Sequence, residues 1–139
     1  MAVLARLRMS AQLDNLGKFI GSLSDCARAQ GFEQEKISKI ELAAEEALVN
    51  IFRYAYPEAT GDVEIVCDLD GDRFTVEIID RGIPFDVTAM PDPGLDGGDP
   101  QREPGGLGIL LMRKLMDEVH YRREKGRNIL TLIIHKDER

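Results

Sequence analysis

The sequence predicts an α+β fold in which helices cover one face of a mixed or antiparallel sheet. Segments whose apolar residues alternate stand beside segments whose apolar residues follow helical spacing. The helical segments come before and after hairpin-like strand pairs, which is the order typical of an α+β sandwich. A chain of 139 residues suits one hydrophobic core, so we expect a single domain over residues 1–139.

The first half of the chain is expected to hold one strand and two helices. Residues 3–9 alternate apolar side chains with arginines, as in a strand that has one buried face. Ser10 is expected to cap a helix that stops at Gly31. Residues 33–56 carry an apolar stripe at three-then-four spacing, which predicts a second helix that ends before Pro57.

The second half predicts two hairpins with a loop and a helix between them. Residues 63–69 and 74–78 alternate in hydrophobicity and are joined by the turn sequence Asp-Gly-Asp. A helix is expected over 108–118, followed by strands over 119–123 and 128–135. Because the last strand is apolar on both faces, we expect it to be central in the sheet.

Composition narrows the classes of partner. A net charge of −7 disfavours direct contact with nucleic acid or with an anionic membrane. The two cysteines lack metal-ligand spacing, and no stretch approaches the roughly 20 apolar residues of a membrane span. We therefore expect a cytoplasmic protein with free thiols. The negative net charge does not exclude a nucleotide as a ligand, because backbone N–H donors can hold phosphate inside an acidic protein.

Residues 86–104 form an unusually long irregular segment. They hold four of the 6 prolines and show no hydrophobic period, which favours a lid over a plain insertion. The segment leads into Gly106-Leu107-Gly108 and an apolar helix. Glycines permit close backbone approach, and free amides at a helix N-terminus attract anions. Without Walker or Rossmann spacing, this motif alone favours a flexible join before the helix over a phosphate site.

Two further motifs place polar side chains at the edge of apolar surfaces. Glu46 and Asn50 stand about 40° apart on the second helix, one turn from each other, so they can share a ligand or form a solvated pair. Asp80 continues the buried face of its strand, just before Gly82. A buried carboxylate needs a donor, either an adenine amino group or the backbone of a turn that it caps.

The order and spacing of these motifs resemble the ATP-binding domain of the GHKL superfamily, which gyrases, histidine kinases and mismatch-repair ATPases share. Glu46-Ala-Leu-Val-Asn50 resembles the N box, Asp80-Arg-Gly82 the first glycine box and Gly106-Leu-Gly108 the second. The segment 86–104 stands where the superfamily has its ATP lid. Within the superfamily, the chain is most similar to the stand-alone anti-sigma-factor serine/threonine kinases.

This resemblance implies a two-layer α/β sandwich of the Bergerat type, with a mixed sheet covered on one face by three helices. It implies ATP and Mg²⁺ as cofactors, with Asn50 as the metal ligand and Glu46 as the catalytic base. Asp80 is implied to bind the adenine amino group. The other residues that the resemblance implies in cofactor binding are Gly82, Gly106, Leu107 and Gly108.

The function implied is that of an ATP-dependent kinase in transcription regulation. The kinase would phosphorylate an anti-anti-sigma protein, sequester a sigma factor and form a homodimer. The alternative is an ATP-binding switch that sequesters a regulator without kinase activity. Sensor histidine kinases fit less well, since both histidines lie near the C-terminus. Tyr54 stands where relatives often have histidine, Thr131 is left out of the site, and Arg102 is assigned to the phosphates from its position and charge alone.

Overall fold

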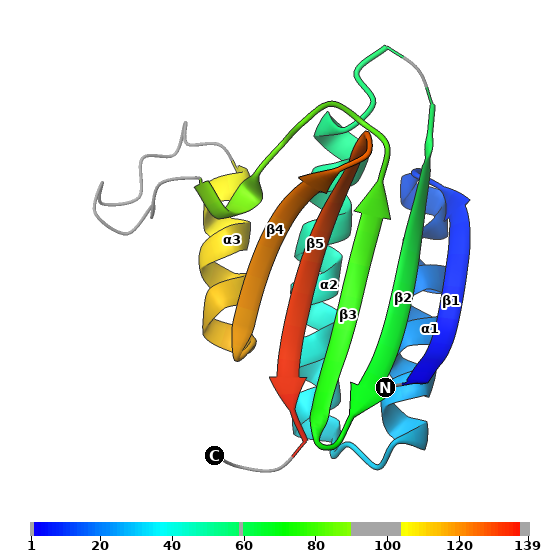
Figure 1. Cartoon of the computed structure of the whole chain (residues 1–139), viewed down its shortest axis with the longest axis vertical. Helices are drawn as coiled ribbons and strands as arrows, with labels where there is room; N and C mark the ends of the chain where they lie inside the picture. Colours follow the sequence, from blue (N-terminus) through cyan, green and yellow to red (C-terminus); the bar gives the residue numbers. More distant parts are fainter. Residues whose placement is uncertain (1, 59, 90–103, 137–139) are drawn as a thin grey trace.

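The computed structural model describes residues 2–58, 60–89 and 104–136, which form two layers (Figure 1). One layer is a five-stranded sheet with the order β1-β2-β3-β5-β4. Its neighbouring strands are all antiparallel. The α+β sandwich is thus confirmed and the expected mixed sheet is wrong, because the hairpins β2–β3 and β4–β5 make antiparallel neighbours. The strands are β1 (Ala2–Ser10), β2 (Asp62–Asp70), β3 (Arg73–Asp80), β4 (Glu118–Glu124) and β5 (Arg127–His135).

The other layer consists of helices that lie behind the sheet in Figure 1. In the described part of the chain, none of them combines the length and the apolar character needed to cross a lipid bilayer. Short 3₁₀ turns precede α1 and follow β3. The elements are η1 (Leu13–Asn15), α1 (Leu16–Ala29), α2 (Gln34–Tyr54), η2 (Val87–Ala89) and α3 (Pro104–Leu115).

The first helix begins later than the sequence predicts. Ser10 ends β1 and Asn15 directly precedes α1, so the assignment of Ser10 as a helix cap is wrong. Nδ2 of Asn15 instead donates to the carbonyl and hydroxyl oxygens of Ser10, at 3.0 and 2.9 Å. These bonds hold a turn between strand and helix. The helix then ends as expected before Gly31, whose φ of 89° is the left-handed conformation that glycine adopts without strain.

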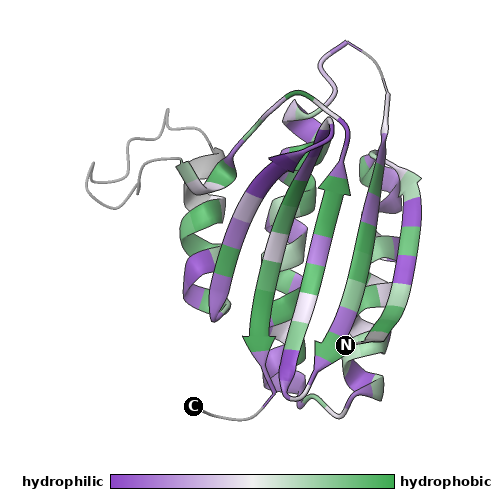
Figure 2. Ribbon diagram, in the orientation of Figure 1, coloured by the Kyte–Doolittle hydropathy of each residue, from purple (hydrophilic) through white to green (hydrophobic). Residues whose placement is uncertain are grey.

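The core lies between the two layers and follows the alternation of the strands. Phe74 on β3 is fully buried and meets Phe32 edge-on, with ring centroids 5.2 Å apart. Figure 2 shows hydrophobic residues along most of β5. Ile129 on β5 packs with Val66 and Ile79 on the opposite face of the sheet. The apolar character of β5 on both faces therefore matches an interior strand, although β3 is the middle one.

The two cysteines come together across the layers. Cys26 lies on α1 and Cys67 on β2, and both are free thiols. Burial is the main cause that raises the pKa of each thiol. Both are thereby held as neutral core groups and not as reactive thiolates.

Candidate functional site

Asp80 ends β3 with its carboxylate on the core side of the sheet, as the alternation predicts. It is 4% exposed. The backbone N–H of Gly82 and Nδ2 of Asn128 both donate to Oδ1, each at 2.9 Å. Burial raises the pKa of Asp80, while these two bonds and the charge of Arg123 oppose the rise. Because both bonds end on Oδ1, Oδ2 is the oxygen that remains available to a ligand donor.

Asn128 is the site residue that sequence reasoning missed. It lies on β5 directly opposite Asp80 and donates a second bond from Nδ2 to the carbonyl of Ile83, at 2.7 Å. Its Oδ1 accepts from the hydroxyl of Tyr121 and from Arg123. Asn128 thus joins Asp80 to the β4–β5 hairpin. The signal that could have found it is the strand register, which pairs Asp80 with Asn128.

Thr131 lies on the other face of β5 from Asn128. It stands three residues along the strand, opposite Glu77 on β3, so its side chain points away from the helices. Leaving Thr131 out of the site is consistent with this placement.

A small cavity adjoins Asp80 between the sheet and α2. The free space within it is about 20 Å³, room for about one water molecule and far less than a purine needs. Phe85 forms part of its wall, and the Phe85 ring lies 5.5 Å from that of Tyr54. A purine can enter this space only if such side chains move. The lining residues are Ala47, Ile51, Ala55, Ile78, Asp80, Phe85, Val87, Tyr121, Asn128 and Leu130.

Glu46 and Asn50 meet the glycine-rich start of α3. A Cβ placed on Gly108 would lie 2.9 Å from Oε2 of Glu46 and 3.5 Å from Nδ2 of Asn50. Only glycine leaves this gap open without pushing the Glu46 carboxylate aside. Asn50 is 3% exposed, while Glu46 is half-buried, so the two side chains line the contact at different depths, as their helical positions predict.

The side-chain amide of Asn50 is an orphaned polar group. Its Nδ2 is buried and has no hydrogen-bond partner among the residues that the structure describes. Turning the amide by 180° would put Oδ1 in the same place. An unpaired buried amide is costly, so it favours a ligand at this point.

An amide oxygen beside a carboxylate and helix amides suits a magnesium-bound phosphate. Within the described residues, no cluster of three or more histidine, cysteine, aspartate or glutamate side chains could hold a metal ion. The donors present therefore fit a cation that is held jointly by one protein amide and by phosphate oxygens, which is the usual way that Mg²⁺ is bound with a nucleotide.

The glycine motif belongs to α3 itself. The helix begins at Pro104 and not at Gly108 as expected, so Gly106, Leu107 and Gly108 lie in its first turns. The N–H groups at the start of an α-helix lack partners within the helix and attract anions. Because Pro104 has no N–H, Gly105 and Gly106 are the helical residues that offer free amides here. Of the lid assigned to 86–104, residues 90–103, with Arg102 among them, fall outside the described residues.

The Asp80 turn is tied to the end of α2. Ile83 donates its backbone N–H to the carbonyl of Ala55 at 2.9 Å. A Cβ on Gly82 would lie 2.2 Å from that carbonyl oxygen. Ala55 follows Asn50 by five residues, about 7.5 Å along the helix. The Asp80 turn and the start of α3 therefore both lie against the C-terminal half of α2, which brings the three sequence motifs to one side of the sheet.

Solved structures of other proteins share this fold. The chain superposes with a TM-score of 0.66 on a protein in the SiaB–SiaC complex from Pseudomonas aeruginosa, at 17% identity, over 95% of this chain and 89% of that one. With the RsbU and RsbW domains of Rv1364c from Mycobacterium tuberculosis, the TM-score is 0.65 at 18% identity, over 94% of this chain and 32% of that chain. The fold is that of an ATPase-type α/β sandwich.

The family follows from the sequence match. Residues 9–134 match the histidine kinase-like ATPase domain, and the chain belongs to this family. Among curated relatives, it is 29% identical over 113 residues to a serine-protein kinase RsbW of Bacillus cereus, which covers 78% of this chain and 71% of the relative. The RsbW protein of Bacillus mycoides is 27% identical over 113 residues. These matches confirm the resemblance to the GHKL superfamily.

Proposed function

We propose that this protein is an ATP-dependent serine/threonine kinase that acts as an anti-sigma factor. It phosphorylates an anti-anti-sigma protein and sequesters a sigma factor. The observation that carries the proposal is the contact of Gly108 with Glu46 and Asn50. It puts a carboxylate and an unpaired side-chain amide against the first turns of α3. The relatives named serine-protein kinases and the likeness to a protein solved in a complex support it.

Separate parts of the site hold separate parts of the nucleotide. Oδ2 of Asp80 accepts from the adenine amino group, and Gly82 lets the turn approach α2. The amide of Asn50 offers its oxygen to Mg²⁺, and the first turn of α3, where Gly106 has a free N–H, holds phosphate oxygens. Gly108, one turn from Pro104, leaves room beside Glu46. When bound, Mg-ATP supplies the transferable γ-phosphoryl group and the cation that offsets its charge.

Glu46 accepts the proton of the hydroxyl group that receives the phosphoryl group. Its Oε2 lies at the start of α3, beside the residues assigned to the phosphates, and its side chain is half-buried. A carboxylate here orients the serine or threonine hydroxyl of the partner and accepts its proton as the oxygen bonds to phosphorus and ADP leaves. The conservative change Glu46→Gln keeps the shape and removes the proton acceptor.

Nucleotide binding is tested by thermal stabilisation. Mg-ATP at 100 times its Kd should stabilise the fold by about 2.7 kcal/mol, and Asn50→Ala should reduce this effect more for Mg-ATP than for ATP with a chelator. If Mg-ATP does not raise the melting temperature of the wild-type protein, the protein does not bind ATP and the proposal fails.

Kinase activity is tested by transfer of label from γ-labelled ATP to a cognate anti-anti-sigma protein. Glu46→Gln should reduce the rate of transfer by about 100-fold or more, which is the usual contribution of a positioned proton acceptor to the rate. Glu45→Gln is the matched control, because Glu45 is the neighbouring but exposed carboxylate on α2. Equal transfer in both variants refutes the role of Glu46. Wild-type protein that binds Mg-ATP and the partner without transfer is instead a sequestering switch.

A further inference from the structure

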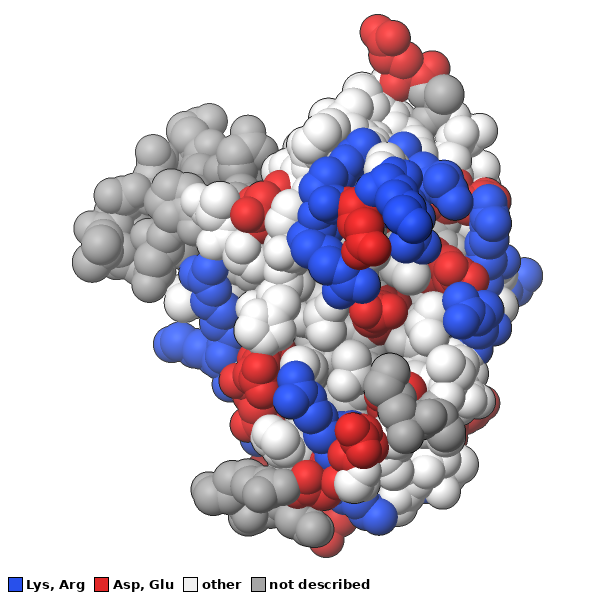
Figure 3. All heavy atoms as spheres, viewed as in Figure 1, with Lys and Arg blue, Asp and Glu red and all other residues white. Residues whose placement is uncertain are grey.

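The face of the sheet away from the helices carries a concentration of arginines. The whole chain has a net charge of −7. Figure 3 nevertheless shows basic side chains gathered over the upper part of this face, where β3 ends and the β4–β5 hairpin turns. A local positive region on an acidic protein attracts anionic ligands selectively. Asp80 borders this positive region at the end of β3. None of the residues that the resemblance assigns to the nucleotide accounts for its arginines.

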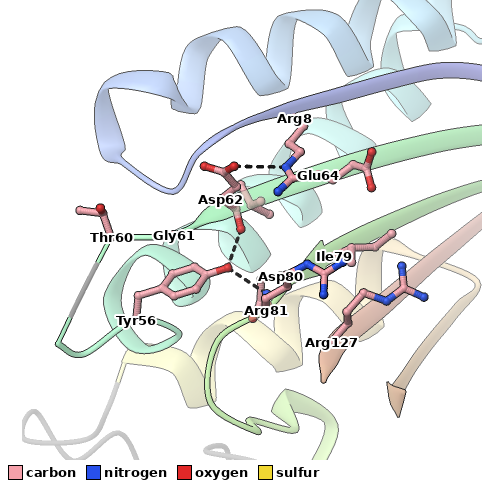
Figure 4. A pocket seen from close by; sticks show the side chains of 11 residues that line it. Arg8, Tyr56, Thr60, Gly61, Asp62, Glu64, Ile79, Asp80, Arg81 and Arg127 are labelled. Atoms are coloured by element: carbon pink, nitrogen blue, oxygen red, sulfur yellow. Dashed lines mark hydrogen bonds and ion pairs between the residues drawn. The ribbon is translucent and has the colours of Figure 1, made fainter. Parts of the chain in front are cut away.

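A pocket of about 320 Å³ opens in this region (Figure 4). Its wall is held by the hydroxyl of Tyr56, which donates to the carbonyl of Asp62 at 2.6 Å and accepts from the backbone N–H of Arg81 at 2.8 Å. These bonds tie the end of α2 to β2 and to the turn after β3. The lining residues are Arg8, Tyr56, Thr60, Gly61, Asp62, Val63, Glu64, Ile79, Asp80, Arg81 and Arg127.

Arg81 and Arg127 both line this pocket, Arg81 directly after β3 and Arg127 at the start of the neighbouring strand β5. The antiparallel pairing of the two strands ends at Asp80 and Asn128, so both arginines lie at the same end of this ladder. Like charges that share a pocket repel each other. Neither guanidinium forms an ion pair with any carboxylate in the described part of the chain. The arrangement therefore carries a repulsion that a bound anion would relieve.

The other charges around the pocket are already matched. Arg8 pairs with Asp62 at 3.1 Å, and Arg6 pairs with Glu64 at 3.3 Å. The carboxylate of Asp80 is turned toward the helix side, where Gly82 and Asn128 donate to it. Arg127 lies opposite Glu124 in the β4–β5 hairpin. The pKa of that exposed carboxylate is lowered by its hydrogen bond with Arg122 and, to a smaller extent, by the charge of Arg127. Of the arginines that line the pocket, Arg81 and Arg127 are thus the two whose guanidinium groups form no ion pair in the described part of the chain.

We propose that this pocket binds a phosphate dianion between the guanidinium groups of Arg81 and Arg127. Two guanidinium groups that form no ion pair in the described part of the chain suit a doubly charged oxyanion, and the arginine fork matches phosphate oxygens in geometry. The pocket shares Asp80 with the residues assigned to the nucleotide, but it opens on the opposite face of the sheet from Glu46 and Asn50. Its volume leaves room for a phosphate group that is free or carried by a larger molecule.

The test is a titration of the full chain with inorganic phosphate at constant ionic strength, followed by NMR of the backbone amides and arginine side chains. Saturable shifts are expected at Arg81 and Arg127. Arg81→Gln and Arg127→Gln should each weaken binding about 10-fold. Arg53→Gln, an exposed arginine of α2, is the control for a loss of charge alone and should leave affinity unchanged. The Arg81 and Arg127 variants should melt at or above the wild-type temperature.

The outcomes separate this pocket from the nucleotide site and identify the source of the phosphate. Shifts confined to Gly108 and its neighbours, or affinity that falls in Asn50→Ala and not in Arg81→Gln, overturn the proposal. Equal affinities of Arg81→Gln, Arg127→Gln and Arg53→Gln overturn it as well. A phosphoserine peptide that binds more tightly than inorganic phosphate, while its unphosphorylated form does not bind, indicates a protein-borne phosphate. Equal binding of the peptide and inorganic phosphate indicates the free ion.

Discussion

Gly108→Ala should separate the stability of this protein from its activity. An added Cβ would lie 2.9 Å from Oε2 of Glu46, and ordinary contact begins at 3.4 Å, so the oxygen must withdraw by about 0.5 Å. The far end of a glutamate can do so at little cost. Alanine within a helix is favoured over glycine by about 0.5–1 kcal/mol. The melting temperature should therefore rise by about 1–4 °C.

Activity should move the other way. A misplacement of 1 Å costs on the order of 100-fold in rate, so a shift of about half that size should reduce phosphoryl transfer about 10-fold. Melting is followed by circular dichroism, and transfer by label incorporation into the cognate partner. Gly21→Ala is the matched control, since Gly21 lies within α1 and a Cβ there meets nothing within 4 Å.

The control makes the prediction refutable in both directions. Gly21→Ala should gain similar stability and keep full activity. If Gly108→Ala transfers phosphate and binds Mg-ATP as well as Gly21→Ala, then Gly108 serves helix packing alone and the assignment of the site at the start of α3 is wrong. A fall of several degrees in the melting temperature of Gly108→Ala would contradict the view that the Glu46 side chain yields easily.

Two further substitutions test the Asp80 end of the site. Gly82→Ala should destabilise the fold by about 1–3 kcal/mol in urea unfolding, because its Cβ would meet the backbone carbonyl of Ala55 at 2.2 Å and neither chain can move freely; unchanged stability would show that this packing is loose. Asp80→Asn should raise the melting temperature at pH 7, because burial holds the pKa of Asp80 above its ordinary 3.8 and the ionised form opposes folding. That gain should shrink as the pH falls through the raised pKa toward 3.8, where wild-type Asp80 is protonated; a gain that is constant with pH would exclude the ionisation of Asp80 as its cause.

The elements of the fold were predictable because their signals are local. The apolar stripe of α2 and the alternation along β2 and β3 depend on residues a few positions apart. The errors also have local causes. Ser10 resembled a helix cap, but its hydroxyl and carbonyl are bonded to Asn15 in a turn. The start of α3 was placed too late, because glycine predicts a loop when its packing partner is unknown.

The candidate site was only partly predictable. The shared face of Glu46 and Asn50 follows from helix geometry, and the burial of Asp80 follows from strand alternation. Asn128 was missed because its role comes from the register of β5 against β3. No motif surrounds it in the sequence, and its neighbours are those of an ordinary buried strand.

By itself, the sequence determined which segments form helices and strands and which faces they bury, since periodicity is set by the backbone geometry of each element. It also identified the motifs of the family. Only the tertiary structure decided that the sheet is antiparallel, that Gly108 lies against Glu46, and that Arg81 and Arg127 line one pocket. Such contacts join segments far apart in the chain, and their geometry depends on strand register and on the packing of helices between layers, which no local pattern specifies.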